Sequence, residues 1–481
     1  MVETDGFSCY VAEFVGTFML VFTIGCDVLT NASASFAGIS IGCVLMVMIY
    51  SLAQSSGANF NLAVSVALGL CRKMDWPEVG LYVTIQVLGG LSGAVCYCLF
   101  LQKPFNLEPI PGHSWKEAAV AEMVYTFMLC FAVLNTAASK VHGGKNQFYG
   151  LAIGFVVVAG AYSGGNISMG CFNPAVAIAI DVSSPLQGVK YCFLYTLAEL
   201  VGACLAAAFF VVCRPEELEP DDDRPICAPG LFAKLTSEFL GTYMLVLTIG
   251  LTILSKSPAA ALAVAAALLS MTFALGSVSG GHFNPAVTTA VYAAGHTDMD
   301  AGNWGSYVLA QAGGGCVAGI TYPFLMGGET IALKLSSSSH SASQICMAEC
   351  VFTVMLAFVY LSVATVKTPL TDLYGFAVAM AFLSGAVAVG PISGGIFNPA
   401  VSLGIASSDS LVGKNANLWD GLVYTFVQAF GGVVAAVLFH ITHASELKAV
   451  AISVYHVMDF DYEEGESSVA LGDDPESKQE I

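Results

Sequence analysis

Two short markers recur four times along this chain at nearly constant intervals. A glutamate opens a long apolar run at Glu13, Glu122, Glu238 and Glu349, with steps of 109, 116 and 111 residues between them. An asparagine motif follows each glutamate after 48, 51, 46 and 49 residues. Two different markers that keep one spacing four times over predict a single unit of about 110 residues, copied four times.

Each unit is predicted to contain three membrane spans. In the first unit they cover 8–29, 36–56 and 79–101. The apolar stretch 61–70 is too short to cross a membrane alone, because a spanning helix needs about 20 residues. The composition agrees, since 56% of the residues are hydrophobic and 11% are charged, against roughly a quarter charged in soluble domains. We therefore predict an all-α membrane protein with twelve spans.

An odd number of spans turns each unit upside down relative to the unit before it. Units one and two are then related by inverted topology, as are units three and four, which is typical of membrane proteins whose site lies between repeats at the membrane midplane. The predicted domains are 1–213 and 231–446, with six spans each. A solvated acidic linker over 214–230 separates them, and an acidic, disordered tail over 447–481 follows.

The positive charges favour cytoplasmic termini. With the termini inside, ten Lys and Arg residues fall on the cytoplasmic side and six on the other, in line with the positive-inside rule. Residues Met1 to Asp5 lack the basic region of a cleavable signal, so the first apolar run is expected to remain as a span. Both a plasma membrane and a vacuole-type membrane are compatible with this pattern.

Composition and motifs exclude several classes of function. The net charge of −19 leaves no basic surface for nucleic acid. The fifteen cysteines include no C-x-x-C pair and no Cys/His cluster at zinc spacing. They are interpreted as small buried hydrophobic residues in reduced form, and neither a metal nor a cofactor is expected. An enzyme is not expected either, because nucleophile–base pairs and phosphate loops are lacking.

The asparagine motifs have the chemistry of a helix that begins inside the membrane. Such a helix must satisfy its first backbone N–H groups without water. Asn caps them and keeps amide protons for a cavity, while Pro suits the first helical position because it has no N–H. A preceding Ser-Gly-Gly, as at 279–281, allows an extended backbone with exposed carbonyls. We predict re-entrant half-helices that begin at Asn61-Leu62-Ala63, Asn173-Pro174-Ala175, Asn284-Pro285-Ala286 and Asn398-Pro399-Ala400.

Paired Asn-Pro-Ala loops after an Ala-Glu-Phe-x-Gly-Thr opening resemble the aquaporins, or major intrinsic proteins. The resemblance covers residues 8–442, twice over, and Phe-Asn-Pro-Ala-Val occurs three times. It implies two tandem bundles, each with six transmembrane helices, two re-entrant half-helices and a passive water pore. The half-helix N-termini would each place roughly +0.5 charge at the pore centre, which repels cations. Leu62 departs from the family pattern by replacing Pro, but Asn61 is kept and domain 1 is expected to stay open.

The four glutamates are interpreted as buried braces of the re-entrant loops rather than as a proton relay. Each stands beside Gly or Thr near the start of an apolar run, and no second ionisable residue recurs at the same place in all units. Acids inside a membrane are functional by default. Here the predicted function is support of the loop backbone.

The resemblance also implies a selectivity constriction. Water-selective members carry Arg directly after the second Asn-Pro-Ala, where this chain has Val176 and Val401. The implied positions are Ile41, Ala161, Gly170 and Val176 in domain 1, and Val264, Ala386, Gly395 and Val401 in domain 2. They are small, apolar and uncharged, and the valine resembles plant tonoplast-type members. We expect ammonia, urea or hydrogen peroxide to pass besides water. Glycerol is disfavoured because Ala177 and Ser402 replace the Asp of glycerol-type members.

Two isolated residues are candidates for the pore wall. Cys171, two residues before Asn173, could bind a mercurial, although simple packing is the alternative. His282 could line the inner vestibule. Asn59 is the matching residue in domain 1, which favours a polar lining group over a titrating switch.

Two other functions are compatible with twelve spans. A secondary transporter needs intramembrane carboxylates at its substrate site, whereas the recurrent carboxylates of this chain stand at helix starts. A non-conducting membrane scaffold would show no water flux in either domain. The expected partners are water, small neutral solutes and the lipid bilayer. Because family members form tetramers, two copies of the chain could build a four-pore dimer.

Overall fold

The structure is a computed structural model that describes residues 6–30, 34–184, 188–219, 228–412 and 418–446. The tail predicted over 447–481 lies outside the described residues. No strand occurs in the described ranges. Eleven of the described helices are long and apolar enough to cross a membrane. The prediction of an all-α membrane protein is therefore confirmed.

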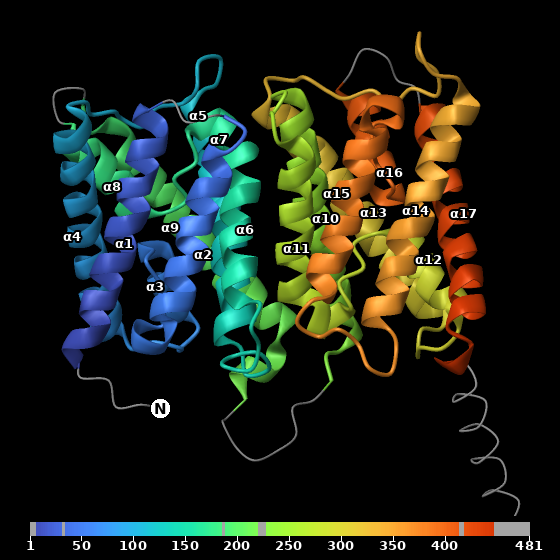
Figure 1. Cartoon of the computed structure of the whole chain (residues 1–481), viewed down its shortest axis with the longest axis horizontal. Helices are drawn as coiled ribbons and strands as arrows, with labels where there is room; N and C mark the ends of the chain where they lie inside the picture. Colours follow the sequence, from blue (N-terminus) through green and yellow to red (C-terminus); the bar gives the residue numbers. More distant parts are fainter. Residues whose placement is uncertain (1–5, 31–33, 185–187, 220–227, 413–417, 447–481) are drawn as a thin grey trace, which may run out of the picture.

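Two bundles with the same order of elements stand side by side (Figure 1). The first contains α1 (Gly6–Leu29), α2 (Ala37–Ser56), α3 (Leu62–Leu70), α4 (Trp76–Leu101), α5 (Trp115–Val133), α6 (Tyr149–Tyr162), α7 (Gly165–Ser168), α8 (Pro174–Ser183) and α9 (Lys190–Cys213). The second contains α10 (Leu231–Leu254), α11 (Ala260–Ser279), α12 (Pro285–Ala294), α13 (Ala301–Leu325), α14 (Ala342–Ala364), α15 (Tyr374–Ser393), α16 (Pro399–Leu411) and α17 (Leu418–Thr442).

The short helices that follow the asparagines are the predicted half-helices. In Figure 1, α3 and α12 lie in the lower half of the bundles, and α8 and α16 lie in the upper half. The two half-helices of a bundle, α3 with α8 and α12 with α16, thus enter it from opposite faces. The termini of the described chain, at the start of α1 and the end of α17, both lie at the lower face.

One predicted span is interrupted. The fifth span of the first bundle is divided into α6 and α7, whereas its counterpart α15 is a continuous helix of 20 residues. The break falls at Ser163 and Gly164, and Asn166 Nδ2 donates to Tyr162 O at 2.9 Å across it. Two successive glycines, 164 and 165, weaken a helix, and the asparagine amide occupies a carbonyl that the helix would otherwise use.

The two bundles are joined mainly by α6 of the first and α11 of the second, with further contacts of α5 and α9 to α10, α11 and α13 (Figure 1). Apolar packing is supplemented by a few polar contacts. Tyr125 Oη lies 3.0 Å from Thr248 Oγ1, and Ser270 Oγ donates to the carbonyl of Ala152 at 2.8 Å. All four residues are buried. Such hydrogen bonds fix the relative register of helices in a membrane, where apolar packing alone is poorly selective.

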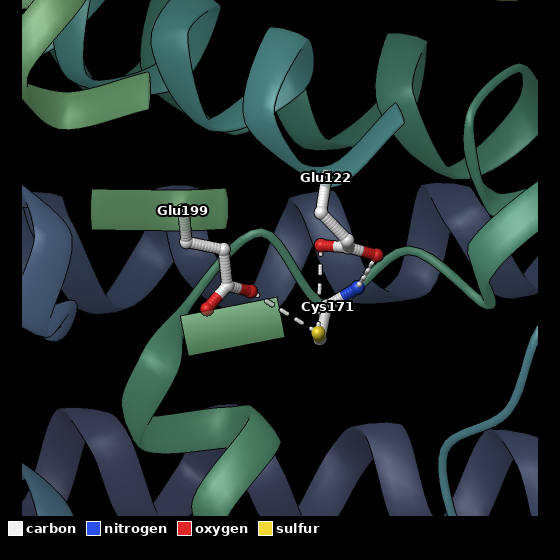
Figure 2. Close-up of side chains that lie close together, drawn as sticks. All are labelled: Glu122, Cys171 and Glu199. Carbon is white, nitrogen blue, oxygen red and sulfur yellow. Dashed lines mark hydrogen bonds between the residues drawn. The ribbon is translucent and has the colours of Figure 1, made fainter. Parts of the chain in front are cut away.

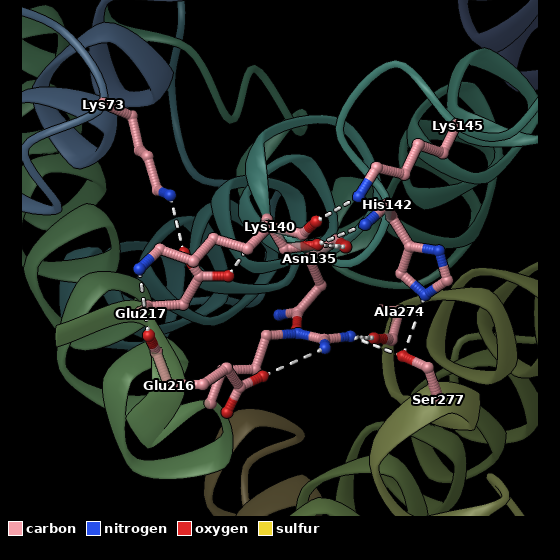
Figure 3. A network of polar contacts seen from close by, with 11 residues as sticks. Lys73, Asn135, Lys140, His142, Lys145, Glu216, Glu217, Ala274 and Ser277 are labelled. Atoms are coloured by element: carbon pink, nitrogen blue, oxygen red, sulfur yellow. Dashed lines mark hydrogen bonds and ion pairs between the residues drawn. The ribbon is translucent and has the colours of Figure 1, made fainter. Parts of the chain in front are cut away.

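The first residues of the predicted linker are packed against the bundles, which corrects the expectation of a solvated chain from residue 214 onward (Figure 3). Arg214 directly follows α9 and is fully buried. Its Nε donates to Asn135 Oδ1 and its Nη2 donates to Ser277 Oγ on α11, both at 2.7 Å. Glu216 Oε1 lies 3.6 Å from Nη1. Because a buried charge is costly without partners, this arginine holds the ends of the two bundles together.

Glu217, which follows the arginine's partner Glu216, is also paired rather than solvated. Lys73 Nζ lies 2.6 Å from Glu217 Oε2, and the backbone N–H of Lys140 donates to Glu217 Oε1 at 2.7 Å (Figure 3). Composition alone marked this stretch as solvated, because six acids lie within 216–223. The tertiary structure brings cations to the first two of them, while residues 220–227 lie outside the described ranges.

We expect the junction between the bundles to weaken as the pH falls from about 6.5 towards 4. His142 Nε2 lies 2.8 Å from Ser277 Oγ, and burial together with the nearby Arg214 and Lys145 lowers the pKa of His142 to about 4. The unfolded chain therefore binds a proton in this range before the folded chain does, and stability is lost as the pH falls. The apparent Tm in detergent should decline by a few degrees between pH 7 and pH 5, and His142→Gln should flatten this decline. Equal pH slopes for both proteins would contradict the assignment.

Candidate functional site

In each bundle the two motif asparagines bond across the bundle centre. Asn61 Nδ2 donates to the carbonyl of Phe172 at 2.9 Å, and Asn173 Nδ2 donates to the carbonyl of Phe60 at 2.8 Å. The second bundle repeats the arrangement, from Asn284 to Phe397 at 2.9 Å and from Asn398 to Phe283 at 2.8 Å. The half-helices of a bundle therefore meet with their N-termini facing each other.

The same asparagines cap their own half-helices. Asn61 Oδ1 accepts from the backbone N–H of Ala63 at 2.9 Å, and the other three caps have bonds of 2.8–3.0 Å. α3 begins at Leu62 with the same extended cap as the three half-helices that begin at Pro. The proline is thus not required for this geometry. Since a side-chain amide has two N–H bonds and one crosses to the opposite loop, each asparagine keeps a second donor.

Each loop reaches its asparagine through a left-handed backbone. The phenylalanine before the asparagine has a φ of 47–51° in all four loops. A positive φ is costly for a bulky residue. Ala58 and Met169 also adopt a positive φ. At the equivalent positions, the loops of the second bundle have Gly281 and Gly394. Such a backbone persists only when its surroundings hold it in place.

A buried glutamate holds each loop. Glu13 on α1 accepts from Ser56 Oγ, from the backbone N–H groups of Asn59 and Phe60, and from Gln86 Nε2 on α4, at 2.8–2.9 Å. The second bundle has two equivalent sets: Glu238 with Ser279, His282, Phe283 and Gln311, and Glu349 with Ser393, Ile396, Phe397 and Gln428. With its N–H groups bound to a carboxylate behind it, the loop can direct its carbonyls to the opposite side.

The second unit departs from this pattern, because Glu199 on α9 occupies the place of the glutamine (Figure 2). Glu122 accepts from Ser168 Oγ at 2.6 Å and from the backbone N–H of Phe172 at 2.7 Å. Glu199 Oε1 accepts from the backbone N–H of Asn173 at 2.8 Å, and the Cys171 thiol lies between the two carboxyl groups. The sequence analysis did not identify Glu199. When the Gly-containing segments of the last span in each unit are aligned, Glu199 stands where the other three units have a glutamine.

The same three side chains are the candidates for a metal ion in the described part of the chain. One ligand atom from each of Glu122, Cys171 and Glu199 lies within 4.8 Å of the others. Both carboxyl groups, however, already accept the loop N–H groups that the half-helix needs. A metal would therefore compete with the brace.

The first bundle encloses a cavity of about 400 Å³ that reaches the asparagine pair. Its wall contains Asn61, Asn173 and Cys171 at the centre, and Gly144 and Gln147 at the lower face. The remaining wall is mainly aliphatic and includes Leu20, Leu45, Ile49, Val64, Leu129, Val133, Ile153 and Val157. A polar pair in an apolar, face-connected cavity can bind a small polar molecule weakly and release it.

The second bundle divides the same path into two cavities. A vestibule of about 490 Å³ is lined by Lys234, Asp298, Tyr307 and Tyr360, among others. A space of only about 10 Å³ lies at the asparagine pair, lined by Asn284, Asn398, Phe382 and Val401 with aliphatic neighbours. His282 contributes to both walls. It therefore stands between the vestibule and the centre.

The family model described as "Major intrinsic protein" matches four stretches of the chain, 2–167, 148–257, 227–372 and 337–462. The chain belongs to this family. Three curated relatives each match less than half of it. Probable aquaporin NIP4-2 of Arabidopsis thaliana is 34% identical over 40% of this chain and 69% of its own length. Nodulin-26 of Glycine max is 30% identical over 42% and 77%, and Aquaporin A of Dictyostelium discoideum is 29% identical over 46% and 82%. This major intrinsic protein is thus a tandem duplication.

The residues predicted for the constriction of this major intrinsic protein have different neighbours in the two bundles. In the second bundle, Val401 lines the central space, and a Cβ built on Gly395 would lie 3.0 Å from Ala386 Cα. In the first bundle, Gly170 instead approaches Gly165, with 2.9 Å between a built Cβ and the Gly165 Cα. None of the four residues predicted for that bundle borders its cavity. The break between α6 and α7, at Ser163 and Gly164, lies two residues after Ala161.

We expect mercuric ion to act on the first bundle of this major intrinsic protein selectively. Cys171 lines the first cavity, whereas Ile396 holds the equivalent place in the second bundle. A mercury atom on this thiol would occupy the path beside Asn173. Stopped-flow water permeability should fall to the contribution of the second bundle, and Cys171→Ser should abolish the inhibition. Undiminished inhibition of that variant would place the reactive thiol elsewhere.

Proposed function

We propose that this membrane channel passes water and small neutral solutes such as ammonia, urea and hydrogen peroxide, and that each bundle forms a separate water pore. The observation that carries the proposal is the reciprocally bonded asparagine pair at the centre of both bundles. Glycerol is disfavoured by Ala177 and Ser402.

The asparagine pair explains weak and selective binding of water. Each asparagine retains one N–H that can donate to a passing oxygen, and a single hydrogen bond contributes only about 1 kcal/mol. The facing half-helix N-termini add a positive potential that repels cations, and a water that accepts bonds from both asparagines donates no proton between them. Entry and release can therefore both be fast.

The absence of a constriction arginine supports passage of neutral solutes. Val176 and Val401 hold the relevant positions, and both described arginines, Arg72 and Arg214, lie outside the membrane spans. We expect Val176→Arg combined with Val401→Arg to reduce urea permeability while water still passes. Unchanged urea permeability would show that these valines do not line the constriction.

We also propose that two copies of the chain associate as a four-pore dimer with cytoplasmic termini. In the apolar stretches of α10 and α11, 78% of the residues are buried, against 39% in α1 and 22% in α2. The difference arises because α10 and α11 are covered by the first bundle. In the first bundle, α1 and α2 are the counterparts of α10 and α11, and in the second bundle α14 and α15 are the counterparts of α5 and α6. The first pair of one chain can therefore repeat this interface with the second pair of another chain.

Osmotic shrinkage of proteoliposomes tests the proposed function. Serine keeps the capping acceptor but removes the long amide donor, so Asn61→Ser with Asn173→Ser, and Asn284→Ser with Asn398→Ser, disable one pore each. We expect each pair to lower water permeability and all four changes to lower it to that of empty liposomes. Wild-type protein without water flux would favour a membrane scaffold. Saturable, gradient-driven uptake would favour a secondary transporter.

A further inference from the structure

We propose that the two pores differ in selectivity: solutes larger than water cross only the first bundle, and His282, Tyr360 and Phe382 restrict the second bundle to water. This inference rests on the proposed function, since it assigns the solutes to one of the two pores. It is carried by the unequal cavities and by the side chains that produce them.

The positions compared are equivalent in the two bundles. Helix α15 matches α6–α7 without a gap, from Tyr374 and Tyr149 onward, so Phe382 corresponds to Val157. On α14 and α5 the brace glutamates are in register. Tyr360 lies eleven residues after its glutamate, and its counterpart at the same distance is Val133. His282 and Asn59 both stand two residues before their asparagine.

Phe382 narrows the centre of the second pore. It lines the space that contains Asn284 and Asn398, and its ring packs against Phe397 with 6.1 Å between centroids. The ring is therefore held by the residue that precedes the second asparagine. In the first bundle the smaller Val157 lines the cavity.

His282 and Tyr360 close the approach from the vestibule. The ring centroid of His282 lies 5.1 Å from that of Tyr360 and 5.5 Å from that of Tyr307. His282 Nδ1 lies 3.0 Å from Thr288 Oγ1, and Tyr360 Oη donates to the carbonyl of Gly280 at 2.8 Å. Both rings are thus fixed by hydrogen bonds as well as by packing.

The first bundle lacks this barrier. Asn59 Nδ2 donates to Ser65 Oγ at 3.1 Å, and Val133 faces the same cavity. The cavity is continuous from Gln147 at the lower face to Asn61 and Asn173. Its approach therefore has Asn59 and Val133 at the two positions where the second bundle has His282 and Tyr360.

The volumes set the size limit. A cavity needs roughly 10–15 Å³ to hold one water molecule, and the space at the second asparagine pair is about 10 Å³. A single water fits there, but urea, with four heavy atoms, does not. In the first bundle, by contrast, Asn61 and Asn173 border the same cavity of about 400 Å³ that forms the approach.

Exchange of the three residues between the bundles tests the inference. The narrowed protein carries Asn59→His, Val133→Tyr and Val157→Phe, and the widened protein carries His282→Asn, Tyr360→Val and Phe382→Val. We expect the narrowed protein to lose urea permeability down to the level of empty liposomes and to keep part of its water permeability. The protein with all six changes should regain urea permeability through its second bundle.

Several outcomes would overturn the inference while leaving the proposed function intact. They are wild-type urea flux in the narrowed protein and absence of urea flux in the six-change protein despite water flux. Loss of all water flux in the narrowed protein would instead overturn both the inference and the proposed function, because its second bundle is unchanged. Val201→Phe, on the exposed side of α9, is the matched control for adding a ring to the first bundle. If the wild-type protein itself passes no water, the proposed function fails instead.

Discussion

Glu238→Ala should destabilise the second bundle by at least about 4 kcal/mol, since hydrogen bonds to charged groups contribute about 1.5–3 kcal/mol each. Four donors lose their acceptor at once: Ser279 Oγ, the backbone N–H groups of His282 and Phe283, and Gln311 Nε2. Water cannot replace the carboxylate as the acceptor of these four donors, because Glu238 is fully buried. Apparent Tm in detergent and the yield of folded protein should both fall, and the water flux of the second pore should be lost.

The second unit supplies a matched control for this prediction. Glu199→Gln would give that unit the glutamine found at 86, 311 and 428, so we expect it to fold with unchanged or higher Tm. Glu199 Oε2 has no hydrogen-bond partner, and an amide there could donate to Glu122 as the other glutamines do to their glutamates. A loss of stability as large as that of Glu238→Ala would show that the second carboxyl group is itself required.

Gly315→Ala should displace half-helix α16 and reduce water flux through the second pore. A Cβ built on Gly315 would lie 2.3 Å from the carbonyl oxygen of Ala400, in the first turn of α16. Overpacking of this kind costs roughly 1–3 kcal/mol. The displacement would also move Asn398, which caps the same turn. Stopped-flow permeability and Tm of the purified variant measure the two effects.

Helix α13 contains its own control for the added methyl group. Apart from its own stretch of helix backbone, Gly305 has no atom within 4 Å of a built Cβ, so Gly305→Ala should leave permeability unchanged. It should stabilise the helix by roughly 0.5–1 kcal/mol, since alanine loses less backbone freedom than glycine. If Gly315→Ala behaves like Gly305→Ala, the close approach of α13 and α16 is not required for the pore.

Most of the fold could be predicted because its signals are local and repeated. The apolar runs, the Asn caps and the glutamate at each unit start are properties of short segments, and four copies make each signal stronger. The break between α6 and α7 was not predicted, although its glycines are visible in the sequence. The matching residues of α15 remain helical despite Pro391, so propensity alone does not decide where the chain interrupts a helix.

The sequence by itself determined the membrane-spanning helices, the inverted units and the capped half-helices, since these depend on the order and period of residues along one segment. Only the tertiary structure decided that Arg214 is buried between the bundles. It also decided that Glu199 lies close to Glu122, although 77 positions separate them in the sequence, and that the cavities at the two asparagine pairs differ in size. The physical reason is that burial, pairing and free volume are set by side chains from several helices at once. No single segment carries that information.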